Sequence, residues 1–352
     1  MTVTASADAA VRARGIPRPW RLIAAAFLLG ALLIGLGAGP VGIGVTGIAE
    51  SALSHLPFVH VHSPLSSLEE AVLWQIRAPR VALAALVGGM LAIAGSAYQG
   101  VFRNPLADPY LLGVAAGSGL GATLAIAYGH VDVAGQLLPL CAFLGGLAAV
   151  AATYALGRSA GPARAAASLV LAGLTVTLFL TAIQTFVQQQ HTNTLRDVYS
   201  WLLGGFSTAS WSQVAVAAPY IAVSAAAIVL HRRLLDVLSV GDEEAASLGV
   251  NVERLRLVLV VAATAGTAAA VAVSGLIAFV GIIVPHTIRL LVSTSYRAVV
   301  PLSLVVGAGF LVLADVLART VVSPAELPIG VITAVFGAPF FAVVLRSSRT
   351  MR

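Results

Sequence analysis

The amino-acid sequence predicts an all-α, polytopic membrane protein, and three observations support that fold class. Hydrophobic residues make up 59% of the 352 residues and charged residues only 10%, whereas a soluble domain is about half apolar and a quarter charged. The mean hydropathy is +0.97. The apolar residues gather in long runs, and at about 20 residues per span ten runs need roughly 200 residues. This composition excludes a water-soluble enzyme, a secreted disulfide scaffold and a disordered chain.

Ten apolar runs, each ended by charge, proline or a glycine-rich turn, are the expected transmembrane helices. They cover residues 20–39, 78–101, 110–128, 134–157, 166–187, 212–231, 256–273, 276–292, 299–318 and 329–346. Arginines precede the first run as in a signal peptide, but nine more runs follow, so we expect a retained first span. A long polar stretch, 41–76, follows it as an outer loop. The chain thus divides into a tail at 1–19, a membrane domain at 20–346 and a tail at 347–352.

The basic residues are all arginines, and their distribution predicts the orientation in the membrane. With a cytoplasmic N-terminus, sixteen arginines lie on inner segments and four on outer ones, so both termini are expected to be cytoplasmic. The four outer arginines are Arg77, Arg80, Arg196 and Arg319. The arginines sit singly or in pairs beside apolar runs, which disfavours nucleic acid as a partner. A chain without lysine also cannot supply the lysine of a P-loop ATPase.

Titratable residues that could drive chemistry or ion transport are scarce within the apolar runs. Asp315 stands out, and Arg319 one turn later favours a local ion pair near the outer interface. His60 and His62 form an H-x-H, but without an acidic or cysteine partner this pattern predicts no metal site. The sequence holds neither H-E-x-x-H nor G-x-S-x-G, so we expect no catalytic residue, resident metal or cofactor. An ion-coupled secondary carrier and a membrane enzyme remain as alternatives to transport powered by another subunit.

The most informative polar segment is 234–256, on the expected cytoplasmic side. Asp242 can cap a short helix with two glutamates in its first turn, Gly249 suits the end of that helix, and Asn251 can cap the next one. Two helices that meet at a glycine present a small apolar surface suited to a groove in a partner. A plain cytoplasmic loop is the alternative. The residues expected to be exposed on this surface are Ala245, Ala246, Leu248 and Val250.

The segment between the second and third runs predicts a structural role. RNPLADP at 103–109 predicts a stiff, non-helical connector, because proline disfavours the α conformation of the residue before it. Asp108 can also cap the helix that follows. In the third run, Gly113, Gly117 and Gly121 repeat at every fourth position and predict a close approach of neighbouring helix backbones.

Several motifs, in order along the chain, resemble one known family. LGVNVERLR at 248–256 and SGLIAFVGIIVPHTIRLL at 274–291 are similar to the FecCD-type permease subunits of type II ABC importers, which take up iron–siderophores, haem and cobalamin. Four further stretches agree: WQIRAPR at 74–80, RNPLADPYLLGVAAGSG at 103–119, WLLGGFSTASW at 201–211 and LADVLARTVVSPAELPIGVITAVFGAPFF at 313–341. The resemblance covers nearly everything after residue 20.

The resemblance implies the type II ABC importer permease fold, with ten helices per subunit, in the plasma membrane. It implies a second permease copy (a homodimer or a paralogue), two separate ATP-binding cassette ATPase subunits and an extracytoplasmic substrate-binding protein. The chain itself would be a permease that hydrolyses no ATP. Its substrate would be an iron–siderophore in the commonest case, with cobalamin or haem as alternatives.

The resemblance also assigns residues to three roles. Arg77, Arg80 and Arg319 would receive glutamates of the binding protein, since arginine binds carboxylate in a bidentate manner; contact of snorkelling side chains with headgroup phosphates is the alternative. The cytoplasmic gate would fall on Ala166 and Ala167, which depart from the polar pair of some members and favour a hydrophobic constriction. The segment that docks in a groove of the ATPase would comprise Gly241, Asp242, Glu243, Glu244, Ala245, Ala246, Leu248, Gly249, Val250 and Arg254.

Overall fold

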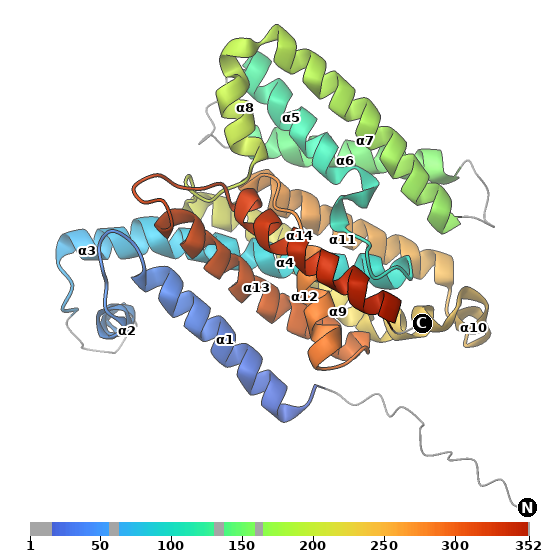
Figure 1. Ribbon diagram of the computed structural model, residues 1–352, viewed down its shortest axis with the longest axis horizontal. Coiled ribbons are helices and arrows are strands. Elements are labelled where there is room, and N and C mark those ends of the chain that lie inside the picture. Colours follow the sequence, from blue (N-terminus) through green and yellow to red (C-terminus); the bar gives the residue numbers. More distant parts are fainter. Residues whose placement is uncertain (1–15, 56–62, 130–136, 159–164, 351–352) are drawn as a thin grey trace, which may run out of the picture.

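The protein is built from helices throughout the part of the chain that the structure describes (Figure 1). This computed structural model describes residues 16–55, 63–129, 137–158 and 165–350. Within those ranges ten longer helices occupy the ten expected runs in order. They are α1 (Arg18–Gly37), α4 (Ala78–Val101), α5 (Val114–Gly129), α6 (Leu137–Arg158), α7 (Ala165–Gln190), α9 (Trp211–Val240), α11 (Val252–Ser274), α12 (Val280–Leu291), α13 (Tyr296–Thr320) and α14 (Ile329–Thr350).

Length and composition divide these ten helices into two groups. Among the described residues, seven helices are long and apolar enough to cross a membrane. The other three are shorter apolar helices, Val114–Gly129, Val280–Leu291 and Ile329–Val344. The all-helical, many-spanning fold predicted from the sequence is confirmed. Most helix ends lie within about four residues of the expected run ends, but α9 continues to Val240, beyond the expected end at residue 231.

The stretch expected to be an outer loop is more structured than its polarity indicated. It contains α2 (Val45–Ser54), α3 (Ser67–Ala71) and a π-helical turn, η2 (Val72–Arg77), which leads without a break into α4. Ser66 begins α3 with a capping box, since its hydroxyl accepts from the Glu69 N–H and the Glu69 carboxylate accepts from the Ser66 N–H. These local bonds, invisible to a hydropathy window, extend the second long helix outward.

Helix α4 lies at the centre of the molecule (Figure 1). Nearly all of its residues are buried, and it packs against α13, α11, α9 and α12. Glycines make this close packing feasible. A Cβ added to Gly88 would lie 2.3 Å from the Gly307 carbonyl oxygen, and one added to Gly95 would lie 2.0 Å from that of Gly281. Such contacts between small residues hold helices together where lipid supplies no hydrophobic drive.

Helices α5, α6 and α7 form a second group, with α8 (Leu195–Leu202) beside them at the top of Figure 1. Two of the three regularly spaced glycines of the third run lie against the backbone of a neighbouring helix. Gly117 faces the Gly145 carbonyl of α6, and Gly121 faces that of Cys141. Gly113 serves another purpose: with φ +83° it ends the short 3₁₀ helix η3 (Pro109–Leu112). The predicted backbone approach is confirmed for two glycines and wrong for the third.

The chain between α11 and α12 is a non-helical break that several segments hold in place. Gly275 and Phe279 bound it with φ of +68° and +70°, and the Tyr110 hydroxyl bonds both the N–H and the carbonyl of Ile277, each at 3.0 Å. The loop between α8 and α9 is fastened beside this break by a backbone hydrogen bond, which the Gly205 N–H donates to the Ser274 carbonyl at 2.8 Å. The Phe279 ring in turn fills the notch left by Gly337 of α14.

Candidate docking and coupling sites

The N-terminal end of α4, which the sequence predicts to be the outer end, carries a buried cluster of arginines and carboxylates. Arg80 pairs with Asp315 of α13 at 2.8 Å and with Glu326, in the loop between α13 and α14, at 2.9 Å. Asp315 also contacts Arg319 at 3.4 Å, which confirms the local pair predicted from their i, i+4 spacing. Charges taken out of water need such partners, because an unpaired buried charge is costly.

The other two arginines, Arg77 and Arg319, donate hydrogen bonds to backbone carbonyls at the C-terminal end of α1. Arg77 donates to the carbonyl oxygens of Leu36 at 2.9 Å and Gly37 at 3.0 Å, and also to that of Val41. Arg319 donates to the carbonyl of Ala38 at 2.9 Å and to that of Gly35. The last carbonyls of a helix lack intrahelical partners and carry partial negative charge, so cations are favourable there. Two arginines from distant segments therefore fix the C-terminal end of α1 to the bundle.

The structure thus brings together the three arginines that the sequence assigned to the binding protein, but it buries them. Arg77 is 4% exposed and Arg80 is 7% exposed, and each guanidinium group has partners within the chain. Sequence reasoning missed Glu326, which is 246 residues from Arg80. A signal was present, because Glu326 lies in the same stretch as Arg319 and only a short loop separates them.

On the opposite side of the chain, the segment expected to couple to the ATPase forms α10 (Asp242–Ser247). It ends as predicted: Gly249 has φ +80°, the Val250 N–H reaches the Ala245 carbonyl at 3.1 Å, and the Asn251 side chain caps α11 through the Arg254 N–H at 2.9 Å. The expectation that Asp242 caps α10 is wrong. Gly241 holds that position with φ +154°, and Asp242 is the first helical residue.

Asp242 makes ion pairs instead of capping. Its carboxylate lies 3.0 Å from Arg256 of α11 and 3.4 Å from Arg103, in the connector that follows α4. Arg103 itself has a left-handed backbone, with φ +49°. Asp236, near the end of α9, likewise joins two helices: its carboxylate accepts a hydrogen bond at 2.9 Å from the hydroxyl of Ser295, which begins α13. The short helix is therefore fastened to the central helices through its carboxylate.

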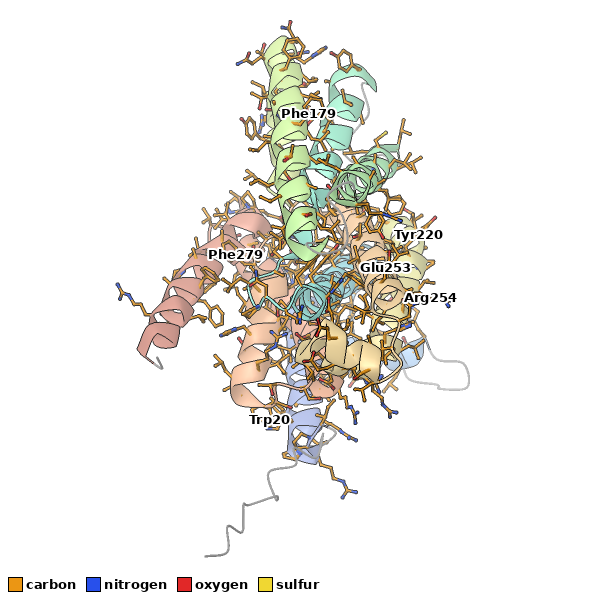
Figure 2. All side chains as sticks on the ribbon, turned by 90° about the vertical axis from the view of Figure 1, so that its right-hand side faces the viewer. Trp20, Phe179, Tyr220, Glu253, Arg254 and Phe279 are labelled. Carbon is orange, nitrogen blue, oxygen red and sulfur yellow. The ribbon has the colours of Figure 1, made fainter. Side chains whose placement is uncertain are left out.

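The apolar surface of this segment is narrower than predicted. Ala245 is fully buried and Val250 packs partly against the core, so the expectation that both are exposed is wrong. The helical period explains this, because residue 245 lies one turn from Gly241 on the face that α10 turns to α9. Leu248 remains 70% exposed, and Arg254, labelled in Figure 2, lies at the start of α11. Among the other residues assigned to coupling, the exposed ones are Glu243, Glu244, Ala246, Gly249 and Arg254.

The connector between α4 and α5 is stiff, as expected, and contains a titratable carboxylate. The Asp108 side chain accepts from the Tyr110 N–H at 2.8 Å, so it caps η3 rather than the long helix itself. Burial raises the pKa of Asp108 to about 6, although its hydrogen bond to the backbone partly opposes the shift. Asp108 is therefore mostly ionised at neutral pH and becomes protonated as the pH falls through about 6.

Two expectations fall on residues that the structure leaves undescribed. The gate residues Ala166 and Ala167 belong to the first turn of α7, but their side chains lie outside the described part of the chain. His60 and His62 also lie outside it. Among the described residues, no group of three His, Cys, Asp or Glu side chains could hold a metal ion.

Comparison with known proteins decides the family. A profile of the FecCD transport family matches residues 26–347. The chain belongs to the FecCD transport family. The resemblance noted in the sequence motifs is therefore confirmed, and this member of the FecCD family is a multi-pass plasma-membrane protein, the permease component of an ABC transporter.

Relatives and a solved structure agree with this membership. The chain is 36% identical to the cobalamin import permease BtuC of Halobacterium salinarum, over 93% of this chain and 95% of that one. It is 35% identical to the iron(3+)-hydroxamate import permease FhuB of Bacillus subtilis, over 82% and 74%. The fold matches a structure described as a metal-chelate type ABC transporter in an inward-facing conformation, with a TM-score of 0.82, 29% identity and coverage of 94% and 99%.

Proposed function

We propose that this FecCD permease imports a metal chelate, an iron–siderophore, in a transporter powered by two ATP-binding cassette ATPases. The observation that best supports coupling to the ATPases is α10, a short helix with an exposed Leu248, tied through Asp242 to Arg256 of α11 and to Arg103 after α4. A helix of this kind can enter a groove of a partner and pass a rigid-body movement to the bundle.

The remaining assembly follows the family. We infer ten spans with both termini cytoplasmic, a second permease copy, and a substrate-binding protein that docks at the outer cluster of Arg77, Arg80 and Arg319. Acidic side chains of that protein suit an arginine cluster, because guanidinium and carboxylate form bidentate pairs. The gate would lie at the start of α7, around Ala166 and Ala167, and would close as a hydrophobic constriction.

Cobalamin is the second candidate substrate, because the Halobacterium salinarum relative named above is a cobalamin import permease. Haem remains a third. An ion-coupled secondary carrier gains no support from the relatives.

Proteoliposomes holding the permease with its ATPases and binding protein would be offered a ferric hydroxamate, cobalamin and haem in turn. Uptake of the ferric hydroxamate that requires ATP supports the proposal; uptake by the permease alone, without ATPase, contradicts it.

The role of α10 has its own test. Leu248→Asp places a charge on the exposed apolar surface, so we expect co-purification with the ATPase to fall at least about tenfold, as for a central interface residue. Thermal unfolding of the permease should stay unchanged, because this side chain packs against little of the chain. Leu53→Asp, an exposed leucine of α2, is the matched control and should retain the ATPase. Equal loss in both variants would contradict the assignment.

A further inference from the structure

Arg80 uses its whole guanidinium group within the chain. Its Nε and Nη2 donate to Asp315, at 3.0 Å and 2.8 Å, along one edge. Its Nη1 and Nη2 donate to the two carboxylate oxygens of Glu326, at 2.9 Å and 3.0 Å, along the other. The pair with Glu326 has the two parallel bonds of a bidentate arginine–carboxylate contact.

The two carboxylates differ in how firmly they are held. The Asp315 side chain is 1% exposed and shared with Arg319, so its removal would leave two buried cations short of a partner. The Glu326 side chain is 40% exposed, and Arg80 is its one ion-pair partner among the described residues. A carboxylate that reaches water loses little when it leaves an arginine, because solvated ion pairs contribute little to stability.

The position of Glu326 would also allow a carboxylate of another protein to replace it at Arg80. It ends a run of exposed residues, 321–326, in the loop between α13 and α14. The loop is anchored just after it, where the Leu327 N–H donates to the Ala318 carbonyl at 2.8 Å. The glutamate side chain can therefore swing away while the backbone stays in place. Once it does, the Nη1–Nη2 edge of Arg80 is left with two open donors.

We propose that Glu326 is an internal competitor: its carboxylate occupies the Nη1–Nη2 edge of Arg80 until a carboxylate of the docking substrate-binding protein replaces it. The inference rests on the proposed docking at the outer arginines. This exchange explains how a buried arginine can receive a partner from outside. One carboxylate replaces another, so the buried guanidinium group never lacks a counter-charge. Asp315 stays in place throughout and keeps Arg80 oriented.

The test is Glu326→Gln in the complete transporter, reconstituted in nanodiscs together with its substrate-binding protein. Glutamine keeps the length of the side chain but binds Arg80 without charge, so we expect about tenfold tighter capture of the binding protein, an amount equal to roughly 1.4 kcal/mol. The gain should shrink as salt rises, because the incoming pair is electrostatic. Glu326→Asp keeps the negative charge on a shorter side chain, so its affinity for the binding protein should lie between those of wild type and Glu326→Gln.

A matched control separates this role from a general change of charge. Glu50→Gln removes one negative charge from α2, on the same outer side, without touching Arg80, and should leave capture within about twofold of wild type. Unchanged or weaker capture by Glu326→Gln, in a variant that unfolds at the wild-type temperature, would overturn the competitor while leaving the docking proposal intact. Failure of the wild-type transporter to capture the binding protein at any salt concentration would overturn both.

Discussion

Helices α4 and α7 are equally apolar in sequence, yet they occupy opposite environments. In the helical segment Ser67–Val101, which contains α4, 83% of the most apolar window is buried inside the protein; in Ser168–Gln190, most of α7, only 28% is buried. Both are long enough to span a bilayer. Hydropathy measures the preference of a segment for the membrane and cannot tell whether its neighbours there are lipid or protein.

The difference arises from side-chain size at the helix surface. In α4, small residues such as Gly88 and Gly95 let α13 and α12 approach to backbone contact. In α7, large apolar side chains stand exposed, and Figure 2 shows Phe179 at the outer edge of the molecule. The exposed members of this set are Leu171, Leu174, Leu178, Phe179 and Phe186. We expect that surface to face lipid or the second permease copy.

The largest expected effect comes from matched leucine truncations. Leu83 of α4 is 0% exposed, and Leu178 of α7 is 64% exposed. Leu83→Ala should cost about 2–5 kcal/mol because it leaves a cavity in the core. Leu178→Ala should change the stability of the isolated permease by no more than about 0.5 kcal/mol. Thermal unfolding in detergent measures both, and equal losses would remove the distinction between the two helices.

The next effect tests the backbone contact of α4. Gly95→Ala places a methyl group against the Gly281 carbonyl, so α4 and α12 must move apart at a cost of about 1–3 kcal/mol. Gly30→Ala in α1 is the control, because nothing lies within 4 Å of the added Cβ. Unfolding temperatures of the two variants decide the point. A Gly95→Ala variant as stable as wild type would mean that the close approach is not needed.

The third effect depends on pH and concerns the connector that joins the end of α4 to η3, which packs on α7. Asp108 has a folded-state pKa of about 6, above the 3.8 of the free side chain, so its ionisation destabilises the fold as pH rises from about 4 to about 6. Asp108→Asn keeps an acceptor for the Tyr110 N–H and removes the charge. It should match wild type near pH 3 and exceed it by up to about 3 kcal/mol at pH 7.5, because the shift of about two pKa units is worth about 1.4 kcal/mol per unit. A difference that does not vary with pH would contradict this account.

Local features of the fold were largely predictable from the sequence. The ten apolar runs became the ten longer helices, and the stop at Gly249 and the cap at Asn251 formed as expected. Each depends on residues a few positions apart. The exposure of Ala245 and the cap at Asp242 were predicted wrongly, because both depend on what α10 packs against.

The candidate sites were only partly predictable for the same reason. Arg77, Arg80 and Arg319 were selected individually from their outer positions and the family resemblance, yet nothing in the sequence indicates that they share partners. Glu326 reaches Arg80 across 246 positions, and Arg319 reaches α1 across 281. Contacts at such separations depend on the arrangement of whole helices, which one sequence does not specify by pattern.

By itself the sequence determined that this chain enters a membrane, where its ten longer helices lie along the chain, and which family it belongs to. These properties come from hydrogen bonds between residues four apart and from the transfer of side chains into lipid, both of which are local. Only the tertiary structure decided which helix forms the core and which arginines are buried. Those outcomes depend on close packing and on ion pairs between distant segments, where a shift of a single side chain changes which partner is within reach.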